Sequence, residues 1–373
     1  MRDQPRVETQ MKNEPDADRP RIHYRPAKGW INDPNGLVWF RGYYHIFYQH
    51  APHYETPWRE SMHWGHARTK DFIHYEELPV ALFPDRPYDR DGCWSGTAIV
   101  KDDVLWLFYA CVRDGAQAVA AAYSNDGIRF EKVDGNPVIA GYPPDGSPDF
   151  RDPAVCRADG RYWCVLASGN RARGSAVLLL YESADLLRWR YRGVMREWEN
   201  AKFAECPSFL KLGEKYLLAA SVCTQDAHRF SMAVGSFSDG RFTAEVTGEA
   251  DQGPDQYAGQ IFRDPQGRAL LLSWIPGWQY AGYRERDIGC MSVPREVTCA
   301  DGTLRVYPAA EVRRFLKDRD PALIRTEQGF RIPRAGRADV VHTGQIRDLK
   351  CLRDADVLEV FVNGGETAYT ALL

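Results

Sequence analysis

The sequence predicts an all-β protein whose main part is a five-bladed β-propeller. The first observation is a repeat of five strand–turn–strand segments, whose turns follow one another at intervals of 53 to 61 residues. The second is a shorter motif that recurs once in most of these units. A period near 55 residues with several strands per unit is typical of propeller blades, whereas helical solenoids have shorter repeats with 3.6-residue periodicity. The five turns lie at Gly42, Asp103, Gly160, Gly213 and Gly267.

Each repeat has the composition of a paired strand hairpin. Its two apolar runs are rich in aromatic and β-branched residues, and a polar or glycine turn separates them. In chain order the hairpins are GLVWFRGYYHIFYQH from 36, GTAIVKDDVLWLFYACV from 96, PAVCRADGRYWCVLASG from 153, PSFLKLGEKYLLAASV from 207 and GQIFRDPQGRALLLSWI from 259. The shorter motif follows as TKDFIHYEE from 69, SNDGIRFEK from 124, SADLLRWRY from 183 and SFSDGRFTA from 236. It predicts one outer strand in each of these units.

Composition and charge exclude several classes of protein. The chain has 373 residues, of which 44% are hydrophobic, enough for a sizeable core. A net charge of -3 leaves no basic surface for a nucleic acid, and no apolar run is long enough to cross a membrane. The N-terminal residues 1–21 are too polar for a signal peptide and are expected to form a polar extension. We therefore expect a cytoplasmic protein whose substrate is uncharged or small.

Nine cysteines are scattered along the chain without a CxxC pair. Their odd number and wide spacing argue against a disulfide framework or a zinc ribbon. We expect them to be reduced thiols, most of them in the core.

The repeat gathers distant residues into one predicted site. The inner strands of a propeller begin around a common axis, so residues at the same distance before each turn should lie close together. Eight to ten residues before the turns stand Asp33, Ser95, Asp152, Glu205 and Tyr257. Their neighbours in sequence are Asn32, Trp94, Arg151, Cys206 and Gln256. Because three of the five positions are carboxylic acids, a site is a better explanation than isolated turn caps.

Three converging carboxylates suit either a metal ion or the acid and nucleophile of glycoside cleavage. Calcium takes more oxygen ligands than three acids supply, and zinc takes histidine or cysteine. The histidines of HWGH, His63 and His66, would point to opposite faces of a strand. We therefore expect no metal. Aromatic rings that stack on sugars are available at Trp58, Trp94, Tyr257 and Trp274, although a single tryptophan packs in the core as often.

Seven motifs in order resemble glycoside hydrolase family 32, the invertase, sucrose-6-phosphate hydrolase and fructanase group. The resemblance extends from about residue 22 to 315, and each motif alone would be weak. The motifs are WINDPNG at 30, FYQHAP at 47, MHWGHA at 62, CWSGTA at 93, FRDP at 150, ECPSF at 205 and PREV at 294.

The resemblance implies a five-bladed propeller at 22–315 that hydrolyses a β-fructofuranosyl linkage with retention and without metal or cofactor. Asp33 matches the nucleophile, Glu205 the acid/base, and Asp152 the residue that holds the fructose hydroxyls. Double displacement needs an ionised nucleophile, a protonated acid and about 5 Å between the two carboxyl groups. The residues expected to bind the sugar are Asn32, Gln49, Trp58, Trp94, Ser95, Arg151, Cys206, Tyr257 and Trp274.

The chain departs from this family after the propeller. Members usually carry a long C-terminal β-sandwich, whereas only 316–373 remain here, and LKCLRDADVLEVFVNGGETAYTALL from 349 resembles its closing strand pair. So few strands would expose sheet edges. We expect this reduced β-sandwich to lie against the propeller or to pair with a second copy of the chain.

Three functions remain open at this point. The main expectation is a hydrolase acting on sucrose, sucrose-6-phosphate or short fructo-oligosaccharides. A fructosyltransferase or an exo-fructanase acting on inulin or levan would use the same three acids. A sugar-binding propeller without catalysis is the third interpretation, which the presence of all three acids disfavours.

Overall fold

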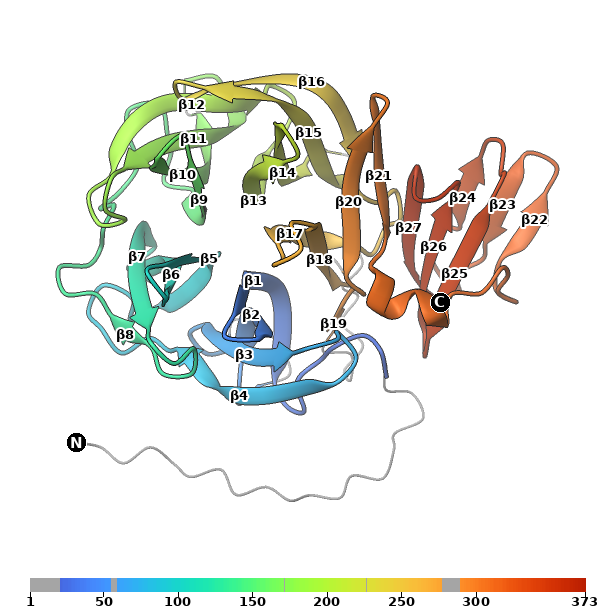
Figure 1. Ribbon diagram of the computed structural model, residues 1–373, viewed down its shortest axis with the longest axis horizontal. Helices are drawn as coiled ribbons and strands as arrows, with labels where there is room; N and C mark the ends of the chain where they lie inside the picture. The colour runs from blue at the N-terminus through green and yellow to red at the C-terminus, as the bar shows by residue number, and fades with distance from the viewer. Residues whose placement is uncertain (1–20, 55–58, 171, 226, 277–288) are drawn as a thin grey trace.

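The computed structural model describes residues 21–54, 59–170, 172–225, 227–276 and 289–373. Strands dominate, and one short 3-10 helix, η1 (Ala310–Phe315), precedes the C-terminal part. The predicted all-β class is confirmed. Figure 1 shows a ring of sheets with a smaller β-sandwich, drawn in orange and red, at one side.

Five antiparallel sheets form the ring, and in each of them strands pair mainly with their neighbours in sequence. The first contains β1 (Trp30–Phe40), β2 (Tyr43–Ala51), β3 (His63–Thr69) and β4 (Tyr75–Leu82). The second contains β5 (Gly92–Lys101), β6 (Val104–Arg113), β7 (Ala116–Ser124) and β8 (Glu131–Lys132). The third contains β9 (Phe150–Ala158), β10 (Arg161–Asn170), β11 (Ser175–Ser183) and β12 (Arg190–Trp198).

The fourth sheet contains β13 (Phe203–Leu212), β14 (Lys215–Cys223), β15 (His228–Ser238) and β16 (Arg241–Glu249). The fifth contains β17 (Tyr257–Arg263), β18 (Ala269–Ile275), β20 (Arg295–Ala300) and β21 (Thr303–Pro308), and the short β19 (Cys290–Met291) also pairs with β18. The strand pairs β1–β2, β5–β6, β9–β10, β13–β14 and β17–β18 coincide with the five hairpins of the repeat.

The first strand of each sheet lies at the centre of the ring (Figure 1). Strands β1, β5, β9, β13 and β17 contact one another in that order, and β17 contacts β1 again. A separate apolar cluster fills the space between each pair of adjacent sheets, five clusters in all. Between the third and fourth sheets, for example, Trp163 meets Phe237 edge to face at 5.1 Å. Each fully buried side chain of this size contributes about 1.5–3 kcal/mol, so the gaps between sheets hold much of the core.

The shorter sequence motif forms a turn and the start of the strand that follows it. In the first three sheets a Ser or Thr hydroxyl and an Asp two residues later bind the turn backbone, as in Ser124 and Asp126. The fourth sheet uses a tighter turn at Asp239 and Gly240 instead. The expected outer strand is therefore present after the turn in each of these four sheets.

The C-terminal module is larger than the strand pair that the sequence suggested. It consists of two three-stranded sheets that share one apolar cluster. One sheet contains β22 (Ile324–Thr326), β23 (Gly329–Ile332) and β24 (Val340–Thr343). The other contains β25 (Leu349–Asp354), β26 (Val357–Val362) and β27 (Thr367–Leu372). The module lies against the propeller, one of the two arrangements that we expected.

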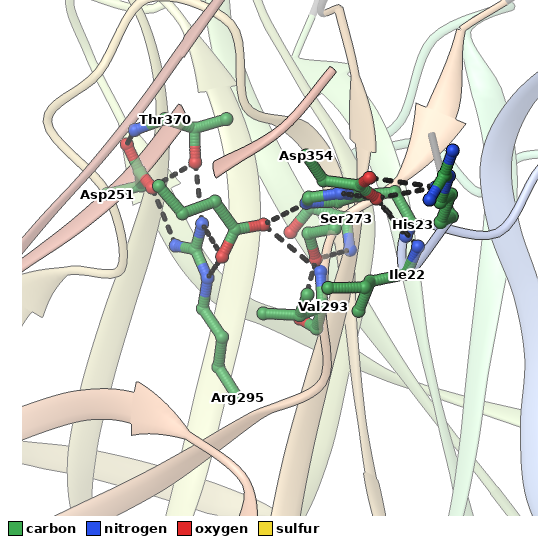
Figure 2. A network of polar contacts seen from close by, with 11 residues as sticks. Ile22, His23, Asp251, Ser273, Val293, Arg295, Asp354 and Thr370 are labelled. Carbon is green, nitrogen blue, oxygen red and sulfur yellow. Dashed lines mark hydrogen bonds and ion pairs between the residues drawn. The ribbon is translucent and has the colours of Figure 1, made fainter. Parts of the chain in front are cut away.

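A buried polar network joins the module to the propeller (Figure 2). Arg295 on β20 is 1% exposed and forms ion pairs with Asp251 at 2.6 Å and with Glu359 on β26 at 3.1 Å. Its guanidinium also donates to the Thr370 hydroxyl at 2.6 Å. On the other side of Glu359 lies His23, whose Nε2 is 3.1 Å from the carboxylate. Every charged member of this network thus has an oppositely charged partner away from water.

His23 should make the stability of the protein depend on pH. Burial alone would lower the pKa of His23, but hydrogen bonds and charge from Asp354 and Glu359 raise it to about 9. A raised pKa means that the folded protein binds the proton more tightly than the unfolded chain, by about 3 kcal/mol. This contribution is complete below pH 6.5, declines between pH 6.5 and 9, and is lost above pH 9.

The test compares urea unfolding of the wild type and His23→Gln at pH 6 and pH 9.5. We expect the difference in unfolding free energy to be largest at pH 6 and to shrink at pH 9.5. His74→Gln is the matched control, because His74 also pairs with an aspartate but its side chain is 80% exposed. A difference for His23→Gln that stays constant with pH would show that the imidazole is neutral in the folded protein.

Candidate active site

Each innermost strand contains a β-bulge close to its N-terminal end. In every case two residues of the strand face one residue of its partner, which turns side chains toward the centre of the ring. The bulged pairs are Asn32–Asp33, Trp94–Ser95, Asp152–Pro153, Cys206–Pro207 and Ala258–Gly259. Asp152, Cys206 and Ala258 have φ values of 58°, 49° and 51°, a region that costs a non-glycine residue about 1–3 kcal/mol.

Asp33 is held by donors from three directions. Its Oδ2 accepts a hydrogen bond from the Ser95 hydroxyl at 2.6 Å, and its Oδ1 accepts one from the Asn32 amide at 3.0 Å. The Cys206 thiol lies 3.5 Å from Oδ2. Burial raises the pKa of Asp33, and the charge of Glu205 adds to this, while the hydrogen bonds oppose it. These donors orient the carboxylate and support its ionised form.

Glu205 lies between a cation and a phenol. Arg151 donates to Glu205 Oε1 from Nη2 at 2.8 Å and from Nε at 3.2 Å, and the Tyr257 hydroxyl donates to Oε2. Burial alone would lower the pKa of Arg151, but the charges of Glu205 and Asp152 raise it, so the guanidinium stays charged. Burial, reinforced by Glu205, raises the pKa of Tyr257, so the phenol keeps its proton.

The register explains why these three side chains meet. Arg151, Glu205 and Tyr257 each directly precede the bulge of their strand, in three consecutive sheets. Equivalent positions in adjacent sheets are neighbours around the ring. The turn-based alignment paired Glu205 with Asp152 instead, because Gly160 is the second residue of its two-residue turn and Gly213 is the first.

Asp152 lies deeper than the other two acids. It is 4% exposed, and its Oδ2 accepts a hydrogen bond from the Cys206 backbone N–H at 2.9 Å. Burial raises the pKa of Asp152 to about 7; the charge of Arg151 opposes this, and those of Glu205 and Asp33 add to it. Asp152 can therefore carry a proton close to neutral pH.

The three acids line one cavity of about 280 Å³. Of the residues predicted to bind the sugar, Asn32, Gln49, Trp94, Ser95 and Arg151 line it as well. Two further lining residues, Gln117 and Asp149, were missed. Gln117 is the second residue of β7, a third strand outside the phase of the repeat, and Asp149 directly precedes the FRDP motif.

The other predicted residues lie beside or below the cavity. Cys206 is buried between Asp33 and Asp152, where burial and their charges raise the pKa of its thiol. Tyr257 reaches the site through its hydroxyl. Trp274 is fully buried opposite Tyr257 on β18 and packs edge to face on Trp30 at 5.7 Å, so it supports the site rather than lining it. Trp58 lies outside the described residues.

The described residues contain no group of three or more His, Cys, Asp or Glu side chains arranged to hold a metal ion. His45 and His66 hydrogen bond to each other at 2.9 Å in the first sheet. All nine cysteines are unpaired, and seven are buried. In the same described part of the chain, no helix has the length and apolar character needed to cross a membrane.

Comparisons with known proteins agree with this geometry. The model of the glycosyl hydrolases family 32 N-terminal domain matches residues 23–308. A sucrose-6-phosphate hydrolase of Escherichia coli is 36% identical over 315 residues, which cover 78% of this chain and 65% of the relative. A raffinose invertase of Escherichia coli is 35% identical over 325 residues, covering 81% and 67%. The chain thus spans about two thirds of the length of these curated relatives.

A solved structure of a GH32 beta-fructofuranosidase from Bombyx mori superimposes with a TM-score of 0.82 and 26% identity, covering 96% of this chain and 89% of the other. A mutant of the same enzyme has been solved in complex with sucrose, with the same TM-score. The family match over most of the chain, together with these relatives, shows that this chain belongs to glycosyl hydrolase family 32.

Proposed function

We propose that the chain is a retaining β-fructofuranosidase that hydrolyses the fructosyl bond of sucrose or short fructo-oligosaccharides. The observation that carries this proposal is the convergence of Asp33, Asp152 and Glu205, from three different sheets, on one cavity. The three acids have different hydrogen-bond partners, as different chemical roles require. The names of the relatives and the sucrose bound in the Bombyx mori structure support the substrate class.

In the proposed first step Asp33 attacks the anomeric C2 of fructose. A C2–O bond to the Asp33 carboxylate forms while the bond to the leaving sugar breaks, and Glu205 gives its proton to the departing oxygen. In the second step Glu205 removes a proton from water, which attacks C2 and releases Asp33. Asp152 binds fructose ring hydroxyls and favours the oxocarbenium-like transition state over the ground state.

The surrounding residues support these steps. Arg151 and Tyr257 fix the orientation of Glu205, and Ser95 and Asn32 fix that of Asp33. Trp94 and Gln49 are available to contact the sugar in the cavity. We infer that each of the five sheets is one blade of a catalytic propeller at 22–315, and that 316–373 is a reduced sandwich module.

The stereochemistry of transfer tests the mechanism. With sucrose in buffer containing methanol, two successive displacements at C2 give methyl β-fructofuranoside, which does not mutarotate and can be identified by NMR. The α anomer would overturn the double displacement and Asp33 as nucleophile. The values of kcat/KM are then compared for a panel of sucrose, sucrose-6-phosphate, kestose, inulin and levan. Oligosaccharide products at high sucrose would indicate a transferase, and no turnover of any member would indicate a sugar-binding propeller.

A further inference from the structure

The leaving sugar must lie on the Glu205 side of the cavity, because in the proposed function Glu205 protonates the departing oxygen. On this side Arg151 links Glu205 to Asp149, whose Oδ1 accepts from Arg151 Nη1 at 3.0 Å. The Asp149 side chain is 66% exposed, whereas that of Glu205 is 19% exposed. The row from Glu205 through Arg151 to Asp149 therefore leads from the reacting bond outward to the rim.

The lining of the cavity has more acidic than basic side chains. Four carboxyl groups line the cavity as a whole, those of Asp33, Asp149, Asp152 and Glu205. Arg151 is the one cationic side chain among the described residues of the lining, and its guanidinium already pairs with Glu205 and Asp149. An anionic group on the leaving sugar would therefore be repelled by Asp149. The described lining residues offer it no cation that is not already paired.

We propose that Asp149 is a specificity residue that disfavours a phosphorylated leaving sugar. The chain accordingly prefers unphosphorylated sucrose to sucrose-6-phosphate, which carries a phosphate on its glucosyl part. Repulsion of an unwanted charge is a common way to select a substrate, and it needs no additional contact with the favoured one. This inference rests on the proposed function, since it concerns the leaving-group side of the same site.

The test measures kcat/KM for sucrose and sucrose-6-phosphate with the wild type, Asp149→Asn and Asp149→Glu. We expect the wild type to prefer sucrose at least tenfold. Asp149→Asn keeps an acceptor for Arg151 but removes the charge. The ratio of kcat/KM for sucrose to that for sucrose-6-phosphate should then fall about tenfold, the size expected for the loss of one repulsive charge near the phosphate. Asp149→Glu should retain the preference. High salt should reduce the preference of the wild type, because this rim is exposed.

The ratio of the two kcat/KM values separates a charge effect from a shift in the position of Arg151, because such a shift would change kcat/KM for both substrates alike. Asp103→Asn is the matched control. Asp103 lies in the turn between β5 and β6, at the opposite end of β5 from Ser95, and its side chain is 78% exposed and forms an ion pair with Arg41. Equal use of both substrates, preference for the phosphorylated one, or an unchanged ratio in Asp149→Asn would overturn this inference and leave the proposed function standing. Failure of the wild type to hydrolyse either substrate would overturn both.

Discussion

Asp33→Asn is expected to lower kcat for sucrose by roughly four orders of magnitude or more. The amide cannot form the covalent bond to C2, so the route through two displacements is lost. The substitution keeps an oxygen that accepts from the Ser95 hydroxyl, so the geometry around it should persist. Because burial raises the pKa of Asp33, the folded protein disfavours its charge, and the variant should melt at the same temperature as the wild type or higher.

Steady-state kinetics with sucrose and a thermal melt together measure this prediction. Asp103→Asn is again the control, and we expect it to retain full activity. Glu205→Gln separates the two roles, because a substrate with a good leaving group, such as p-nitrophenyl β-fructofuranoside, does not need the acid in the first step. Asp33→Asn should be inactive on both substrates, whereas Glu205→Gln should still release nitrophenol in a burst. More than a tenth of wild-type activity in Asp33→Asn would refute its role as nucleophile.

Arg295→Met is expected to destabilise the fold by about 3–5 kcal/mol. Methionine has similar length, but the change leaves the carboxylates of Asp251 and Glu359 buried without their shared cation, and both are fully buried. It also removes the donor to the Thr370 hydroxyl. Since Asp251 belongs to the propeller and Glu359 to the module, the loss should weaken the junction between them.

Urea unfolding followed by tryptophan fluorescence measures this loss, and circular dichroism shows whether the folded state persists. The control is Arg331→Met, which breaks an ion pair with Asp339 at 2.9 Å whose arginine is 47% exposed. An exposed pair of this kind contributes about 1 kcal/mol at most. If both variants lost the same stability, the buried network would not be what joins the module to the propeller.

The repeat in the sequence predicted the ring of hairpins and the residues that meet at its centre. The strands alternate with recognisable turns, so the period could be read directly, and the phase located Asp33, Asp152 and Glu205 in one cavity. The phase slipped by one position between the second and third sheets, and by one more between the third and fourth. Turn glycines mark a hairpin but not which residue of the turn they occupy, and the bulges have no composition of their own.

Other features depend on packing that a local pattern does not contain. Asp149 directly precedes β9 and Gln117 lies on β7, and neither occupies a position that recurs in the repeat. Trp274 has the composition of a sugar platform, yet the close packing against Trp30 buries it. The PREV motif gave no role for Arg295, because its partners Asp251 and Glu359 lie 44 and 64 residues away in sequence.

The contact between His23 and Glu359 spans 336 residues of the chain. During synthesis the first sheet leaves the ribosome long before β26 exists, so His23 lacks its partner Glu359, and Arg295 has only Asp251, until β26 and β27 emerge. Translation therefore has to pass Glu359 before His23 gains this partner, and Thr370 before Arg295 gains the hydroxyl that it binds.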